Sequence, residues 1–175
     1  MLLHWPNADV SIVETTAALA DVKRRGMARH VGISNFTTAL IREAVQASPV
    51  PLVTNQVEYH PFLSQAPVRD ALAEHDMSLT AYCPLARGEV FSNETLTRIG
   101  QAHGKNAGQV ALRWLVQQDD VIAVPRSSNP DHVASNFDIF DFELSAEDMQ
   151  AIDRLHTPDG RMINPSFAPE WDNAG

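Results

Sequence analysis

The sequence predicts an α/β fold in which parallel strands alternate with helices. Short apolar segments rich in Val, Ile, Leu and Thr recur five times along the 175 residues, and each precedes a segment with helical spacing of its apolar residues. The strand candidates are continuous apolar runs without strict alternation, which is typical of parallel strands that are covered on both faces. This repeated strand-then-helix order favours a parallel sheet.

The first two units show the pattern most directly. The strand candidate "MLLH" precedes a helix predicted at residues 12–25, in which Leu19 and Val22 lie three residues apart on one face. The strand candidate "ARHVGIS" precedes a helix predicted at residues 37–47, where apolar residues recur at i and i+4. Both helices therefore have an apolar face that can cover a sheet.

Three further strand candidates, "LVTNQVE", "SLTAYCP" and "VIAVPRS", continue the series. Two helix starts near them are marked by capping-box spacing, at Asn106 with Gln109 and at Ser145 with Asp148. The helices predicted after these strands span residues 66–75, 94–103, 108–118, 131–136 and 146–155.

The composition argues against several classes of protein. The formal net charge is −9 and no basic face is visible, so we expect no nucleic-acid partner. No apolar run approaches the ~20 residues of a membrane span, and the first residues lack the features of a signal peptide. The single cysteine, Cys83, fits a reducing compartment. We expect a cytoplasmic protein without a membrane partner, and because the seven histidines lack ligand spacing, no metal site.

Two parallel architectures compete for this sequence. A doubly wound sheet would carry a G-x-G-x-x-G turn after its first strand, but the only candidate, "RGMARHVG", lacks that spacing and precedes a strand. A barrel gathers its functional side chains at the carboxyl ends of successive strands. The unusual polar and aromatic residues of this sequence lie at such ends, namely His4, Ser34, Asn35, Gln56, Tyr82 and Arg126. The barrel is favoured, although a complete one takes eight units and about 250 residues.

The motifs at these strand ends resemble those of the aldo-keto reductase family. "LLHWP", "VGISNF", "NQVEYHPFL", "AYCPLARG" and "VPRSSNPDHVASNFDIFDFELS" follow that family's order over nearly the whole chain. The ending "PSFAPEWD" is similar to the bacterial 2,5-diketo-D-gluconate reductase B branch. The resemblance implies a single domain over residues 1–175, formed by about the last five β/α units of a TIM (β/α)8 barrel with a C-terminal helix and tail.

The resemblance also implies an activity. The family reduces aldehydes and ketones to alcohols by hydride transfer from NADPH, with NADH as a possible substitute. Small carbonyl substrates such as 2,5-diketo-D-gluconate or methylglyoxal are expected, and the full-length protein is expected to be a monomer. Because the Asp, Tyr and Lys of the family's catalytic tetrad belong to units that precede this chain, the 175 residues alone are expected to be inactive. The alternative is a non-catalytic cofactor-binding or interaction protein on the same scaffold.

Site residues carry over from the family by position. His4 matches the histidine that orients the substrate carbonyl, where an imidazole can donate a hydrogen bond to the oxygen; a strand-end cap is the alternative. Ser34, Asn35 and Gln56 match the residues that bind the nicotinamide carboxamide, and together they offer the donors and acceptors that a primary amide needs. Tyr82 matches the aromatic residue that stacks on the nicotinamide ring.

The loop after the last strand matches the family's site for the 2′-phosphate of NADPH. Arg126 keeps a permanent charge and can contact a phosphate through two donors. His132 stands where the family has an arginine, so we expect NADPH to be preferred less strongly than in relatives with Lys and Arg at these places. Ser135 replaces the usual glutamate of the family, which bears on the contact with adenine. The residues implied for this part of the cofactor are Arg126, Ser127, Ser128, His132 and Asn136.

Several other residues are assigned to packing. Tyr59 is not expected to be the catalytic acid, because its neighbours match a loop beyond the sixth strand of the family. Trp114 lies on an apolar helix face and is predicted to be core. Trp5 and Trp171 could line the substrate mouth or pack inside.

Overall fold

The computed structural model describes residues 1–172, and within them the predicted alternation of strands and helices is confirmed. The strands are hydrogen-bonded in the order β1-β2-β3-β4-β5. Parallel register is seen between β1 and β2, where Leu3 lies opposite Ile33, and between β2 and β3, where Ser34 lies opposite Gln56. The strands are β1 (Leu2–Leu3), β2 (Val31–Ser34), β3 (Leu52–Glu58), β4 (Ser78–Tyr82) and β5 (Val121–Ala123).

The α-helices lie within two residues of their predicted bounds at each end. Sequence reasoning missed a 3-10 segment, Ala86–Ser92, in which Arg87 and Gly88 have positive φ. Left-handed residues interrupt helical periodicity, so no apolar repeat marks this segment. The α-helices are α1 (Ile12–Arg24), α2 (Thr38–Ala47), α3 (Ala66–Ala73), α4 (Glu94–His103), α5 (Ala107–Val116), α6 (Pro130–Phe137) and α7 (Ala146–Asp153).

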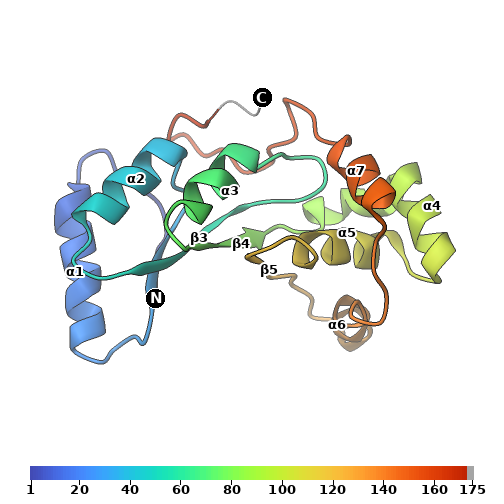
Figure 1. The fold of residues 1–175 in the computed structure, drawn as a ribbon, viewed down its shortest axis with the longest axis horizontal. Helices are drawn as coiled ribbons and strands as arrows, with labels where there is room; N and C mark the ends of the chain where they lie inside the picture. The colour runs from blue at the N-terminus through green and yellow to red at the C-terminus, as the bar shows by residue number, and fades with distance from the viewer. Residues whose placement is uncertain (173–175) are drawn as a thin grey trace. The chain divides into compact units, whose positions relative to one another are not determined.

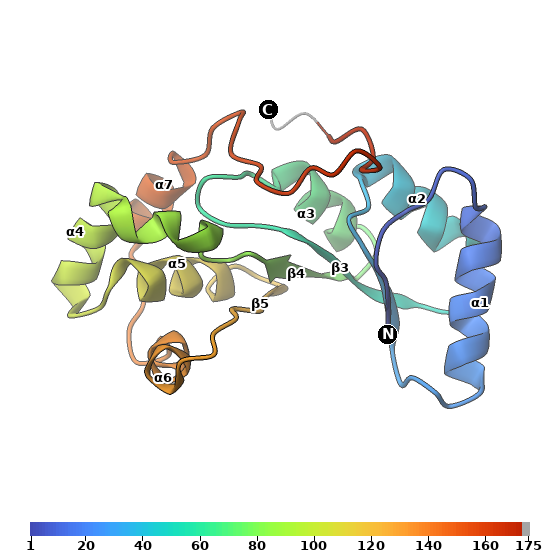
Figure 2. The same cartoon turned by 180° about the vertical axis from the view of Figure 1, so that it is seen from behind.

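The chain divides into two compact units, and the single domain expected from the sequence stays a prediction. The first unit comprises Met1–Val57, Gln65–Thr80 and Asn164–Gly175. In it, α1 lies beside α2 and α2 beside α3 (Figures 1 and 2). Its core includes Val31 and Ile33 of β2, which are fully buried. Burial of such side chains typically contributes about 1.5–3 kcal/mol each.

Within the first unit, the segment after Asn164 packs against residues near the N-terminus of the chain. Trp5 forms edge contacts with Phe167 and Trp171, at ring-centroid distances of 5.5 and 6.0 Å. The backbone N–H and hydroxyl of Thr38 donate to the carboxylate of Asp172, at 2.9 and 2.8 Å. Asp172 thereby serves the N-terminus of α2, whose own capping residue forms no side-chain bond.

The second unit comprises Glu58–Ser64 and Ala81–Ile163. Its core centres on α5, which packs with α4 (Figure 1) and buries Val110, Leu112 and Trp114. Trp114 is 3% exposed, which confirms the prediction that it is core. By contrast, α6 has no buried residue.

No helix within residues 1–172 has the length and apolar character needed to cross a bilayer.

Candidate functional site

In the first unit, the structure brings together the four site residues predicted at the ends of β1, β2 and β3. The hydroxyl of Ser34 donates to the carbonyl oxygen of Gln56 at 2.7 Å. The side-chain amide of Asn35 donates to the carbonyl oxygen of His4 at 2.9 Å and to the Ser34 hydroxyl at 3.1 Å. Because the carboxyl ends of parallel strands meet at one edge, residues far apart in sequence form one polar network.

Asn35 is the centre of this network for a local reason. It follows the last residue of β2 and has a φ of 63°, a left-handed conformation that asparagine tolerates better than most residues. This turn directs its backbone N–H to the carbonyl oxygen of Gln56 at 2.9 Å. The side chain is 1% exposed, so its hydrogen bonds form away from water.

Asn55 supports this network, and sequence reasoning did not identify it as a site residue. Asn55 of β3 is fully buried, and its side-chain amide donates to the carbonyl oxygen of Phe36 at 2.9 Å while its oxygen accepts from the Phe36 N–H at 3.3 Å. Asn55 thereby holds the loop that follows Asn35. An asparagine in the middle of the predicted strand "LVTNQVE" was the available signal, because a buried polar side chain needs a partner.

His4 presents its side chain to solvent at the end of β1. Its ring centroid lies 6.2 Å from that of Trp5, whose other neighbours are Phe167 and Trp171. Trp5 and Trp171 therefore pack together in a partly exposed aromatic cluster beside His4. An exposed imidazole next to such a cluster can offer a hydrogen-bond donor to a small polar ligand.

Substitution of Asn35 tests the network. We expect Asn35→Ala to lower the free energy of unfolding by about 2–5 kcal/mol, because it adds ~1–2 kcal/mol of left-handed strain to the ~1–3 kcal/mol of lost buried hydrogen bonds. Asn35→Gly is the matched control, since it loses the same bonds without the strain and should cost less. Urea unfolding of both variants measures the difference. Equal stability of the two would show that backbone strain plays no part.

In the second unit, four of the predicted residues line one cavity of about 440 Å³. They are Arg126, Ser127, His132 and Asn136. Ser128 was predicted with them but is exposed and does not line this cavity. The loop after β5 and the helix α6 supply these side chains. The rest of the lining includes residues of the turn after β4, among them Arg87.

Sequence reasoning did not predict Arg87 as a site residue, although it lies in the motif "AYCPLARG". The turn that carries it has an unusual backbone, with positive φ at Cys83, Ala86 and Arg87. Such conformations cost about 1–3 kcal/mol each and persist where the surrounding structure requires them. This backbone brings the guanidinium group of Arg87 to the cavity, in addition to that of Arg126. The only sign of this turn in the sequence was the adjacent pair of Arg87 and Gly88.

The cavity is electropositive. Arg126 is exposed and forms no ion pair with any residue in the described part of the chain, and Arg87 adds a second positive charge. The Ser127 hydroxyl accepts from the Asn129 N–H at 3.1 Å, and the Asn129 side chain caps α6 by accepting from the Asp131 N–H at 2.9 Å. This cap occupies part of the helix N-terminus, so the guanidinium groups are the main groups of the cavity that could bind an anion.

The two tyrosines of the chain occupy different settings in the second unit. Tyr59 is buried; its hydroxyl donates to Gln118 at 2.7 Å and its ring lies 5.1 Å from that of Trp114. Tyr82 is half-buried, and burial, with the nearby negative charge of Glu58, raises the pKa of its phenol. A phenol held protonated in this way suits a ring contact better than proton donation.

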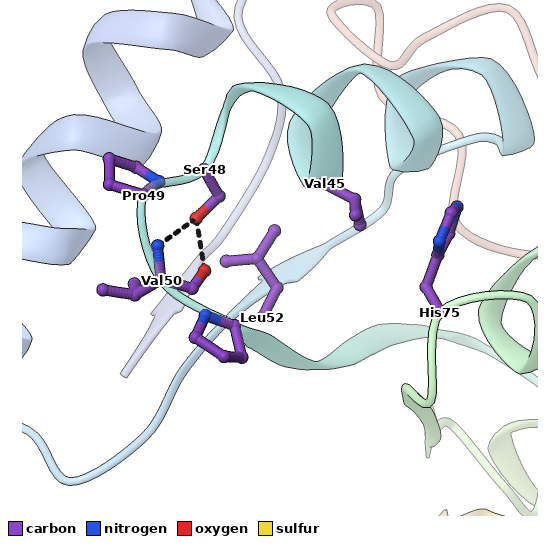
Figure 3. A pocket seen from close by; sticks show the side chains of 7 residues that line it. Val45, Ser48, Pro49, Val50, Leu52 and His75 are labelled. Carbon is purple, nitrogen blue, oxygen red and sulfur yellow. Dashed lines mark hydrogen bonds between the residues drawn. The ribbon is translucent and has the colours of Figure 1, made fainter.

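Two other features of the described residues carry no predicted chemistry. A cavity of about 320 Å³ lies at the start of β3, between Val45, Leu52 and His75 (Figure 3). The Ser48 hydroxyl at its edge donates to the carbonyl oxygen of Val50 at 2.6 Å, so it belongs to the turn. Residues 1–172 contain no group of three or more His, Cys, Asp or Glu side chains that could hold a metal ion.

Comparison with known proteins identifies the relatives of this chain. The model of the aldo/keto reductase family matches residues 1–157. An aldo-keto reductase of Mycobacterium avium is 40% identical over 156 residues, covering 89% of this chain and 54% of the relative. One from Mycolicibacterium smegmatis is 38% identical over 168 residues, covering 95% and 58%. The chain thus spans a little over half the length of these relatives.

Solved structures agree over the same part of the fold. A protein provisionally assigned as 2,5-diketo-D-gluconic acid reductase B is 49% identical with a TM-score of 0.96, covering 98% of this chain and 61% of that one. A mutant of Gox0644 in complex with NADPH is 37% identical with a TM-score of 0.87, covering 93% and 60%. The predicted partial (β/α)8 barrel is confirmed, and the chain belongs to the aldo/keto reductase family.

Proposed function

We propose that this chain is the cofactor-binding and carbonyl-orienting part of an NADPH-dependent reductase that converts aldehydes or ketones to alcohols. The observation that carries the proposal is the electropositive cavity of the second unit, in which Arg126 is unpaired among the described residues. A 2′-phosphate is the group that distinguishes NADPH from NADH, and guanidinium groups bind phosphate through paired donors. Solved relatives in complex with NADPH or NADP support this choice.

The cofactor, when bound, would supply the hydride. The strand-end network of the first unit offers polar groups for its carboxamide. Ser34 and Asn35 already donate within that network, whereas the half-buried amide of Gln56 forms no side-chain hydrogen bond with the residues that the structure describes. We therefore expect Gln56 to make the main contact and Ser34 and Asn35 to position it.

His4 is proposed to act on the substrate side. Its exposed imidazole would donate a hydrogen bond to the carbonyl oxygen as negative charge develops there. Keto-sugar acids and small dicarbonyls, such as 2,5-diketo-D-gluconate or methylglyoxal, are the proposed substrates. The similarity to the provisionally assigned 2,5-diketo-D-gluconic acid reductase B supports this choice.

A non-catalytic cofactor-binding protein is the second candidate, since neither tyrosine of this chain is suitably placed as the proton donor. Tyr59 donates its hydroxyl hydrogen to Gln118 inside the core, and the phenol of Tyr82 has a raised pKa. By resemblance to the family, the tyrosine that donates the proton comes from β/α units that precede this part of the barrel. Both candidate functions include binding of NADPH, but only the reductase converts a carbonyl substrate.

Substitutions at the cavity test the cofactor assignment. We expect Arg126→Ala to weaken NADPH binding about tenfold or more, since a charge-assisted hydrogen bond typically contributes ~1.5–3 kcal/mol. NADH binding should hardly change. His132→Arg should shift the preference further toward NADPH, because it adds a permanent charge. Titration of cofactor fluorescence gives both dissociation constants.

Arg154→Ala is the matched control, because Arg154 is an exposed arginine at the end of α7 that does not line the cavity. It should leave both constants unchanged. An NADPH-to-NADH ratio that is the same in Arg126→Ala and in the unsubstituted chain would contradict the assignment of Arg126 to the 2′-phosphate.

A further inference from the structure

Helix α6 carries residues of the proposed cofactor site, but none of its own side chains is buried in a core. It spans eight residues, none of them buried, and Val133 and Phe137 are 53% and 76% exposed. Yet its residues His132, Ser135 and Asn136 line the electropositive cavity. A helix of this length is not stable by itself and cannot rely here on apolar burial. Polar contacts from neighbouring segments must therefore determine where it lies.

The strongest of these contacts come from Lys105, two residues before α5. Its ammonium group lies 2.9 Å from the carboxylate of Asp138 and 2.8 Å from that of Asp141. It also donates to the carbonyl oxygen of Asp138 at 3.3 Å and lies 5.6 Å from the ring centroid of Phe142. Asp138 is the residue that caps the C-terminus of α6.

Two neighbours of Lys105 reinforce the same end of α6. The side-chain amide of Asn106 donates to the Ser135 hydroxyl at 3.2 Å. Gln109 donates to the carbonyl oxygen of Asp138 at 2.8 Å. The C-terminus of a helix carries a partial negative charge, so a cation placed beside its cap stabilises it.

Lys105 differs from an ordinary surface lysine. Its side chain is only 8% exposed, whereas the side chains of Asp138 and Asp141 are 60% and 61% exposed. Hydrogen bonds to Asp141 and then to Asp138 raise the pKa of Lys105, and the hydrogen bond from Lys105 lowers the pKa of Asp141. The ammonium and the Asp141 carboxylate therefore stay charged throughout the neutral range, and the contact persists there.

We infer that Lys105 is a positioning residue for the cofactor: by binding Asp138 and Asp141 it holds α6 where His132, Ser135 and Asn136 line the cavity. Lys105 itself does not line the cavity. The inference rests on the proposed function for its consequence, which is tighter binding of the 2′-phosphate end of NADPH. The anchoring of α6 is a separate claim that can be measured without any cofactor.

Hydrogen–deuterium exchange of the 175-residue chain tests the anchoring. In Lys105→Met, amides of residues 131–137 should exchange at least ~10-fold faster than in the unsubstituted chain, because local opening becomes easier. Exchange in α5 should stay slow. Lys105→Arg, which keeps the charge and the donors, should restore slow exchange in α6. The chain's other lysine, Lys23, provides the control Lys23→Met, which should change nothing in α6.

Titration with adenosine 2′,5′-bisphosphate tests the consequence. If α6 is in place about one-tenth of the time in Lys105→Met, the dissociation constant rises about 10-fold. Asp141→Asn, a milder change at an exposed residue, should move it in the same direction, and Lys105→Arg should restore it.

The possible outcomes separate the two claims. Unchanged exchange of α6 in Lys105→Met, or equally faster exchange in α5, would overturn the anchoring. Faster exchange of α6 with an unchanged dissociation constant would overturn the positioning role. If the unsubstituted chain does not bind adenosine 2′,5′-bisphosphate, the proposed function fails, and the exchange result still decides whether Lys105 anchors α6.

Discussion

Replacing Glu58 by alanine is expected to lower the free energy of unfolding by about 3–5 kcal/mol, the usual cost of breaking a buried charged hydrogen-bond group. The Glu58 carboxylate is fully buried. It accepts hydrogen bonds from the backbone N–H groups of Met162 and Ile163, at 2.8 and 2.9 Å, and from His60 Nε2 at 3.1 Å. Alanine would leave these donors without an acceptor, away from water.

The segment that leads to Met162 and Ile163 is tightly packed, and this adds to the loss of stability expected in Glu58→Ala. The Thr157 N–H donates to the carbonyl oxygen of Phe62 at 3.1 Å, and a Cβ at Gly160 would overlap that same carbonyl group. Little room is therefore left for the segment to shift toward new partners. Glu143→Ala is the control, because the Glu143 side chain is 86% exposed and its ion pair with Arg113 should contribute no more than ~1 kcal/mol.

The acid dependence of stability provides a second measurement. Burial acts to raise the pKa of Glu58, but hydrogen bonds from His60, Met162 and Ile163 outweigh it and hold the pKa below its ordinary value. The contribution of Glu58 is thus fully present above that ordinary value and is lost as the pH falls through the lowered pKa. Urea unfolding between pH 7 and pH 3 should show a weaker acid dependence in Glu58→Gln. A loss below ~1 kcal/mol in Glu58→Ala would contradict this account.

Replacing His4 by alanine is expected to have the largest effect on catalysis. The test needs a complete barrel, which a chimera can provide by joining the preceding part of the provisionally assigned 2,5-diketo-D-gluconic acid reductase B to residues 1–175. In this chimera, His4→Ala should lower kcat/KM about 10²–10³-fold, the typical cost of removing one donor to a developing oxyanion. The dissociation constant of NADPH should hardly change.

His30→Ala is the matched control, because the His30 side chain is exposed and the substitution keeps its carbonyl oxygen, which accepts from the nitrogen of Met1 at 2.8 Å. It should leave kcat/KM unchanged. If His4→Ala behaves in the same way, His4 is a strand-end residue without a role in orienting the carbonyl.

Local sequence rules predicted the order of elements and part of the site. The capping box of Asn106 and Gln109 is present, with both side-chain bonds formed. Ser34, Asn35 and Gln56 meet because parallel strands end at one edge, which the strand pattern alone implies. Arg126 and His132 were found by motif, and they line a common cavity.

Long-range contacts could not be predicted in this way. Two of the partners of Glu58, the N–H groups of Met162 and Ile163, lie more than 100 residues away in sequence and are backbone groups, which leave no mark in residue type. Lys105 looks like any lysine between two helices until Asp138 and Asp141 are brought to it. The left-handed turn that carries Arg87 has glycine only at Gly88, so its backbone has almost no compositional signature.

NADPH oxidation by the unsubstituted chimera tests the central claim most directly. The donor protein serves as the positive control, and 2,5-diketo-D-gluconate and methylglyoxal are the substrates. If residues 1–175 supply the cofactor contacts and the carbonyl-orienting histidine of a reductase, the chimera consumes NADPH in step with carbonyl loss, and faster than it consumes NADH. A folded chimera that binds NADPH but transfers no hydride would contradict the reductase function and favour a non-catalytic cofactor-binding protein.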